Sequence, residues 1–120
     1  MVTCVGKFLR MLRISKGEIL KNMADRLGVS SAFLSAVENG KKKFPVSWHE
    51  KITKYYNLSP QQIDELKQAV LESSDIIELN LQGLSAQNRQ LAVSFARQFG
   101  SLDEETNKKI YNILNQSKNK

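Results

Sequence analysis

The stretch that decides the fold is MADRLGVSSAFLSAVENGKKKFP, residues 23–45. Its first apolar stripe ends at Gly28, where a left-handed glycine would terminate a helix. Only a tight turn remains before Ser30, which is a good N-cap for a second helix that ends before Gly40. The spacing therefore predicts two short helices, joined by a tight turn and followed by a basic loop.

Helical spacing continues on both sides of this stretch. Apolar residues from Val5 to Leu12 recur at intervals of three and four, and Gly17 ends the stripe. Beyond the basic loop, Ser47 and Ser59 are suitable N-caps for two more helices. The pattern predicts five helices, at about residues 3–15, 18–27, 31–39, 48–57 and 60–73. The inward side chains expected in the fourth helix are Trp48, Ile52, Tyr55 and Tyr56.

Residues 75–83, DIIELNLQG, change to a different period. Every second residue from Ile77 to Leu81 is apolar, which is typical of a half-buried strand. A lone strand has to find a partner, because its backbone groups need hydrogen bonds. Two further helices are expected after it, one capped by Ser85 and one beginning near Asp103.

The charge of the chain is concentrated in its first half. The whole chain has 18 Lys and Arg against 12 Asp and Glu, for a formal net charge of +6. The first sixty residues contain eleven of these basic residues and four of the acids, whereas the remainder contains seven and eight. Such asymmetry predicts an anionic partner for the N-terminal half, although a solvated basic surface would give the same count.

Several classes of protein are disfavoured by what the sequence contains. A single cysteine, Cys4, excludes an internal disulfide and any cysteine-cluster metal site, and it favours a reducing compartment such as the cytoplasm. No apolar run is long enough for a membrane span or a signal peptide. One histidine, His49, without a nucleophile cannot form a triad, and no phosphate-binding glycine loop is found. We therefore expect no enzyme activity, no cofactor and no metal.

Two short helices joined by a glycine-containing turn form a helix-turn-helix, in which the second helix lies in the major groove of DNA. Leu34 and Val37 are expected to fix the second helix to the core. The opposite side carries small residues that allow close approach: serine can donate to or accept from bases, and alanine can contact a thymine methyl. The alternative is that the two helices serve packing only. The expected base-reading residues are Ser31, Ala32, Phe33, Ser35 and Ala36.

Four segments carry a more specific resemblance: VGKFLRMLR, MADRLGVS, SAFLSAVENGKKKFP and EKITKYYNLS, within residues 5–59. In these segments the chain resembles the Cro/C1-type (XRE-like) helix-turn-helix repressors of phages and bacteria. The resemblance implies an all-α, five-helix, lambda-repressor-like domain that binds double-stranded DNA as a dimer on an inverted-repeat operator. It also implies an ion pair between Arg13 and Glu38. The phosphate contacts that it implies are Asn39, Lys41, Lys42 and Lys43.

The chain departs from the family pattern at one place. The second helix begins with Ile19-Leu20, where the family usually has Thr-Gln and uses the glutamine to contact a DNA phosphate. Lys16, Lys21 or Asn22 would then have to supply that contact.

The chain is expected to divide into a DNA-binding domain, residues 1–74, and an extension, residues 75–120. The first hypothesis is a transcriptional repressor or autoregulator of a phage or mobile element, acting as a homodimer. The alternative is an antitoxin or another protein-binding module, in which the extension binds a different protein while the DNA-binding half regulates the operon. The dimerisation residues expected in the extension are Leu79, Leu81, Leu91, Phe95, Phe99, Ile110, Ile113 and Leu114.

Overall fold

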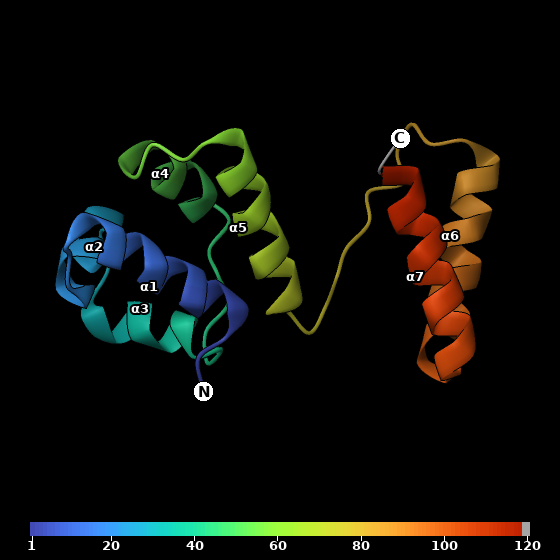
Figure 1. Cartoon of the computed structure of the whole chain (residues 1–120), viewed down its shortest axis with the longest axis horizontal. Coiled ribbons are helices and arrows are strands. Elements are labelled where there is room, and N and C mark those ends of the chain that lie inside the picture. The colour runs from blue at the N-terminus through green and yellow to red at the C-terminus, as the bar shows by residue number, and fades with distance from the viewer. Residues whose placement is uncertain (119–120) are drawn as a thin grey trace. The chain divides into compact units, whose positions relative to one another are not determined.

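A computed structural model describes residues 1–118, with the side chains of residues 1–116, and it is all-α as expected (Figure 1). The chain forms two compact units, Met1–Glu78 and a second unit that begins at Leu79. A 3₁₀ turn, Phe99–Ser101, joins the two helices of the second unit. The α-helices are α1 Cys4–Lys16, α2 Leu20–Leu27, α3 Ser31–Glu38, α4 Trp48–Tyr55, α5 Pro60–Glu72, α6 Ala86–Gln98 and α7 Glu104–Lys118.

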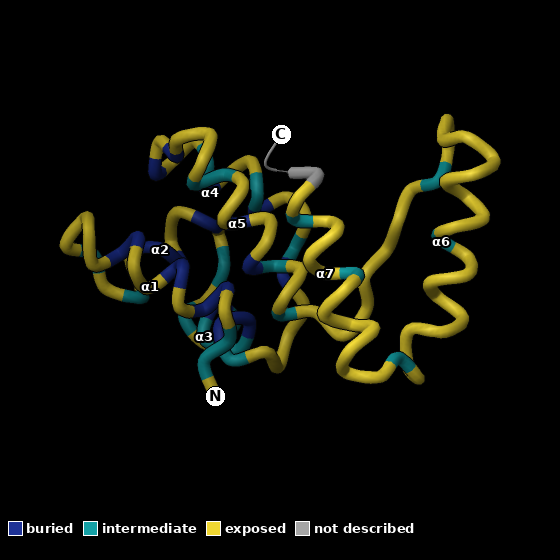
Figure 2. The backbone as a smooth tube through the Cα atoms, turned by 45° about the vertical axis from the view of Figure 1, so that its right-hand side comes forward, coloured by how far each residue is buried: buried dark blue, intermediate teal, exposed yellow. Residues whose placement is uncertain are grey.

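The first unit has a core to which each of its five helices contributes. Leu9 of α1, Met23 of α2, Leu34 of α3, Ile52 of α4 and Leu66 of α5 are all buried almost completely. Figure 2 shows that the buried residues of the chain lie in these helices and the segments that join them. Because the core is shared among α1 to α5, the position of α3 is set by the packing of the whole unit.

Four serines were predicted to cap the starts of helices, and three of them do so in the structure. Ser30, Ser59 and Ser85 each accept a hydrogen bond from the backbone N–H three residues later, at 3.0, 3.2 and 3.1 Å. The predicted cap at Ser47 is wrong, because its side chain makes no capping bond. Its backbone already has helical angles, φ −63° and ψ −20°, whereas a side-chain cap needs an extended residue.

The fourth helix buries one tyrosine fewer than expected. Trp48, Ile52 and Tyr56 recur every four residues and lie in the core, whereas the side chain of Tyr55 is half exposed. The expectation for Tyr55 is wrong because a helix turns 100° per residue, so neighbours in sequence cannot both lie on one narrow face.

The predicted strand in residues 75–83 is also wrong for the single chain. Residues 76–81 have no regular secondary structure, and no strand occurs among residues 1–118. The apolar and polar alternation is present, but a strand exists only when a second strand accepts and donates its backbone hydrogen bonds. No such strand is available within the described chain.

The second unit contains few enclosed side chains. No residue from 79 to 116 is buried, and Leu91, Phe99, Ile113 and Leu114 are exposed. The rings of Phe95 and Phe99 lie 5.2 Å apart. The helices α6 and α7 leave an open, largely apolar groove of about 160 Å³, lined by Phe95, Phe99, Leu102, Asn107, Ile110, Tyr111 and Leu114.

Among the described residues, no helix combines the length and the apolar character that crossing a membrane requires.

Candidate nucleic-acid interface

The turn between α2 and α3 is fixed by backbone hydrogen bonds. Gly28 has φ +73°, and its N–H donates to the carbonyls of Ala24 and Asp25. Val29 N–H donates to the carbonyl of Ala24 at 3.0 Å, and the Val29 side chain packs against the core. These bonds satisfy the last carbonyls of α2 and direct the chain immediately into the Ser30 cap of α3. The two helices therefore meet at a fixed angle.

The exposed side of α3 carries mostly small side chains. Leu34 and Val37 are buried, as predicted, and face the core. Ala32 is exposed, while Ser31, Ser35 and Ala36 are partly exposed. With so little side-chain volume on this side, another molecule can approach the helix closely.

Phe33 differs from its four neighbours on this surface. Its ring is partly buried and lies edge-on against the ring of Trp48, with centroids 5.8 Å apart and an interplanar angle of 77°. Phe33 also packs against the core of the first unit. Only part of its ring is therefore free to contact another molecule. The helical spacing alone does not show that Trp48 covers the rest.

The lysine loop, residues 41–43, follows α3 and is hydrogen-bonded to the last turn of that helix. The backbone N–H groups of Lys41 and Lys42 donate to the carbonyl of Ala36, at 2.8 and 3.2 Å. Asn39 Nδ2 donates to the carbonyl of Ser35 at 2.8 Å, so this amide is already engaged in closing the helix. The three lysine side chains are exposed, and within the described chain no carboxylate lies within ion-pair distance of them. The loop is thus anchored through its backbone while its charges face solvent.

Of the three residues expected to contact phosphate near the start of α2, two are exposed lysines and the third supports the helix start. Lys16 and Lys21 are exposed, the first at the end of α1 and the second in the first turn of α2. Asn22 Oδ1 accepts a hydrogen bond from the N–H of Ile19 at 2.9 Å. Because Ile19 has no side-chain oxygen to cap the helix, Asn22 supports this helix start instead.

A buried carboxylate connects α3 to α1. Glu38 Oε2 lies 2.5 Å from Arg13 Nη1, and Glu38 Oε1 lies 3.1 Å from Arg13 Nη2, which makes the pair bidentate. The side chains are 8% exposed for Arg13 and 1% for Glu38. Arg13 Nη1 also donates to Met23 Sδ at 3.2 Å, so the guanidinium contacts α2 as well. One ion pair therefore links the three helices that form the interface.

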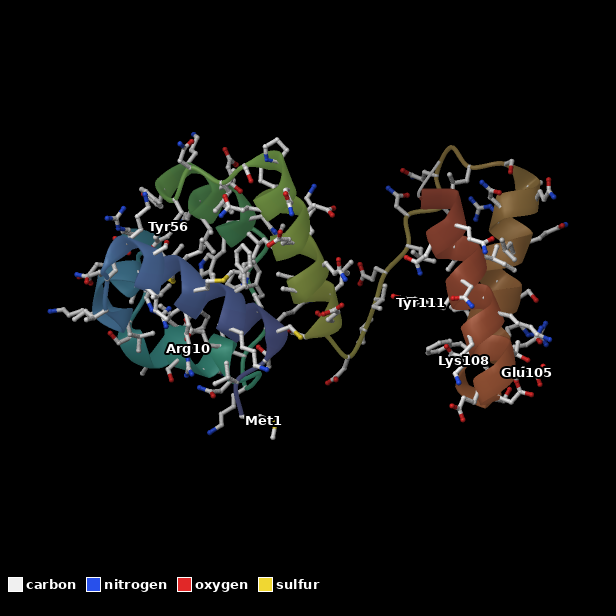
Figure 3. All side chains as sticks on the ribbon, viewed as in Figure 1. Met1, Arg10, Tyr56, Glu105, Lys108 and Tyr111 are labelled. Atoms are coloured by element: carbon white, nitrogen blue, oxygen red, sulfur yellow. The ribbon has the colours of Figure 1, made fainter. Side chains whose placement is uncertain are left out.

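Sequence reasoning missed three more residues at this junction. Arg10, labelled in Figure 3, places Nε 3.5 Å from Glu38 Oε1. Thr3 donates to the carbonyl of Glu38 through both its N–H and its Oγ1, at 3.0 Å each. Gly6 lies so close to α3 that an added Cβ would be 2.3 Å from the Glu38 carbonyl oxygen. Glycine inside a helix is unfavourable, so Gly6 was the available sign of close backbone approach.

A second polar cluster fixes the start of α2. The Tyr56 hydroxyl donates to Glu18 Oε1 at 2.7 Å, and Arg26 Nη2 lies 2.6 Å from Glu18 Oε2. The Arg26 guanidinium also lies over the Tyr56 ring, 5.6 Å from its centroid. Burial, followed by the hydrogen bond to Glu18, raises the pKa of Tyr56, so the hydroxyl stays protonated as a donor. Arg26 lies in α2 and Tyr56, labelled in Figure 3, directly follows α4, so the cluster ties these two helices together.

We expect Gly6→Ala to lower the free energy of unfolding by about 1–3 kcal/mol, because the new methyl group would overlap the backbone of α3. Gly100→Ala is the matched control, since an added Cβ there has no neighbour within 4 Å. Urea denaturation of both variants measures the difference. Equal midpoints for the two variants would contradict the close approach.

Residues 5–66 match a family model described as a helix-turn-helix domain, and the match covers just over half of the chain. The chain belongs to the helix-turn-helix domain family. Membership indicates DNA as the partner and a role in transcription regulation. In this helix-turn-helix protein the matched region contains α1 from its second residue, α2 to α4, and the first half of α5. No curated protein and no solved structure matches the chain. No group of three or more His, Cys, Asp or Glu residues arranged to bind a metal occurs in the described part.

Proposed function

We propose that this helix-turn-helix protein is a transcriptional repressor or autoregulator of the Cro/C1 type that its sequence resembles, from a phage or mobile element. It binds an inverted-repeat operator as a homodimer. The observation that carries the proposal is the exposed side of α3, where small side chains stand on a helix fixed by buried Leu34 and Val37. A helix of this kind fits the major groove without side chains that would hold it away from the bases.

Base reading is assigned to the first turns of α3. Ser31 and Ser35 hydroxyls can donate to or accept from base edges, and the Ala32 and Ala36 methyl groups can contact a thymine methyl. Phe33 contributes only the part of its ring that Trp48 leaves free. The two alanine methyl groups favour thymine at the positions that they contact, whereas the serine hydroxyls can serve several bases.

Phosphate contacts are assigned to the groups around α3. Lys41, Lys42 and Lys43 follow its C-terminal end, with Asn39 before them. Lys16, Lys21 and Asn22 lie around the start of α2, in place of the glutamine that the family usually has there. Because the backbone of the lysine loop is already anchored, the loop loses little main-chain freedom on binding, and its charges can position the protein on the duplex.

The second unit is assigned to dimerisation. None of its residues from 79 to 116 is buried, and its exposed apolar side chains include Leu91, Phe99, Ile113 and Leu114. Large apolar patches of this kind mark interaction sites in soluble proteins. A second copy is the partner that is always present, and a two-fold dimer presents two α3 helices to successive major grooves, which lie about 34 Å apart. If a different protein covers this face, the antitoxin alternative replaces the homodimer.

The DNA assignment is tested with variants of Lys42 and Ser31. Lys42→Ala should weaken binding to all sequences alike and reduce the slope of log affinity against log salt by about 2 per dimer, because each copy loses one phosphate contact. Ser31→Ala should instead change which base is preferred at one position of each half-site.

Fluorescence anisotropy with a selected operator and its single-base variants, at several salt concentrations, measures both effects. Lys54→Ala is the control, since Lys54 lies on α4, outside the assigned contacts, and pairs with Glu50. An affinity that does not depend on salt would contradict DNA binding. Equal changes of base preference in both variants would contradict the placement of α3.

A further inference from the structure

The segment between the two units has unused backbone hydrogen-bonding groups. Residues 75–80 make no backbone hydrogen bond to any other described residue. Ile76, Ile77 and Leu79 are exposed, by 76%, 62% and 66%. Figure 1 shows this stretch as an extended trace between α5 and α6. An extended segment with free N–H and C=O groups and apolar side chains is a template for pairing with another strand.

Its side chains have two different faces. Ile77, Leu79 and Leu81 would project to one side of an extended strand, and Glu78 and Asn80 to the other. Residues 1–118 contain no second strand, so within this described part the segment has no strand to pair with. Isoleucine and leucine at alternate positions are more typical of a strand that has one face covered than of a linker surrounded by solvent.

We infer that this segment pairs with its counterpart in a second copy, as an antiparallel two-stranded ribbon centred on Leu79. In this register Leu79 lies opposite Leu79 of the other copy, and Ile77 lies opposite Leu81. Glu78 then lies opposite Asn80, so no like charges meet. All three apolar side chains of each copy fall on the same face of the ribbon.

Neighbouring registers are less favourable. Centring on Glu78 would set two carboxylates directly opposite each other, which is repulsive. Centring on Asn80 would place Ile77 opposite Gly83, so one apolar pair would be lost. A shift by one residue on one strand alone would mix the apolar and polar faces. The charge and apolar pattern therefore selects the register centred on Leu79.

The ribbon rests on the homodimer proposed above. A two-stranded ribbon is only marginally stable by itself in water. When α6 and α7 hold two copies together, however, pairing of the tethered segments becomes intramolecular, at an effective concentration near millimolar. The second unit thus supplies association, and the ribbon adds a fixed two-fold relation at the point where the DNA-binding units end.

The test is disulfide formation between copies of the full chain, with Cys4→Ser removing the natural thiol. Opposite residues of an antiparallel pair have Cα atoms about 4.5–5.5 Å apart, within the range of a disulfide. Leu79→Cys should form linked dimers on mild oxidation. Glu78→Cys and Asn80→Cys, each alone, should form roughly tenfold fewer, because like-numbered residues then lie diagonally, about 7–8 Å apart and beyond the usual disulfide range. When the two variants are refolded together, about half of the dimers contain one copy of each, and these dimers should link as readily as Leu79→Cys.

Sedimentation of the same reduced proteins separates the two proposals. Dimeric chains that link at Leu79→Cys and in the mixture support the ribbon. Dimeric chains that link equally at all three positions, or not at Leu79→Cys, overturn the ribbon and leave the homodimer standing. Monomeric chains at tens of micromolar overturn both, and the exposed segment and hairpin would then belong to a different protein partner.

Discussion

A chain truncated after Glu78 is expected to bind its operator about 10²–10⁴-fold more weakly than the full chain. The first unit keeps its complete core, so the fragment should fold and retain α3 on its surface. It loses the second unit, whose exposed apolar side chains we assign to dimerisation. Without a tether the second half-site has to be bound from solution, and the gain from an intramolecular second contact disappears.

Sedimentation and operator binding of both chains measure this effect. Phe99→Asp combined with Leu114→Asp, in the full chain, is the matched control for truncation. Both side chains are exposed in the single chain, so these changes should leave each copy folded while they disrupt the interface. The variant should therefore behave as the fragment does. A fragment that stays dimeric and binds with undiminished affinity would show that the second unit has another function.

Glu38→Ala is expected to lower the free energy of unfolding of the first unit by about 3–5 kcal/mol. The substitution removes the partner of Arg13, whose guanidinium is buried and would remain charged without compensation. It also removes the group that joins α3 to α1 at the base of the lysine loop. Urea denaturation measures the loss, and a midpoint equal to that of the natural chain would contradict it.

Two further variants separate the unpaired charge from lost packing. Arg10→Ala should cost less than about 1 kcal/mol, because the Arg10 side chain is 48% exposed and its contact with Glu38 is screened by solvent. Arg13→Met together with Glu38→Leu should regain most of the loss, since both charges leave the interior at once. A double variant as unstable as Glu38→Ala would show that shape, and not charge, governs this junction.

The sequence was sufficient for those features that depend on neighbouring residues. The five helices of the first unit, the Gly28 turn and the serine caps at positions 30, 59 and 85 follow from short-range spacing and side-chain chemistry. The burial of Leu34 and Val37 follows from the same period. Each of these features is decided within one or two helical turns, where the identity of the residues is enough.

Other features needed contacts between distant parts of the chain. The alternating residues 75–83 have the period of a strand, yet no strand forms, because its partner would have to come from elsewhere. Phe33 has a place on the exposed side of α3 by spacing, but Trp48 covers part of its ring. Tyr55 and Tyr56 are equally apolar, and only the packing of α4 decides which of them is buried.

By itself the sequence determined an all-α first unit with two helices joined by a tight turn, and a basic loop directly after them. Only the tertiary structure decided that Arg10 and Thr3 also bind Glu38, and that Gly6 lets α1 pass against the end of α3. The physical reason is that helix formation depends on neighbours a few residues away. Close approach between helices depends instead on side-chain volume and hydrogen-bond partners some thirty residues apart, which no local pattern records.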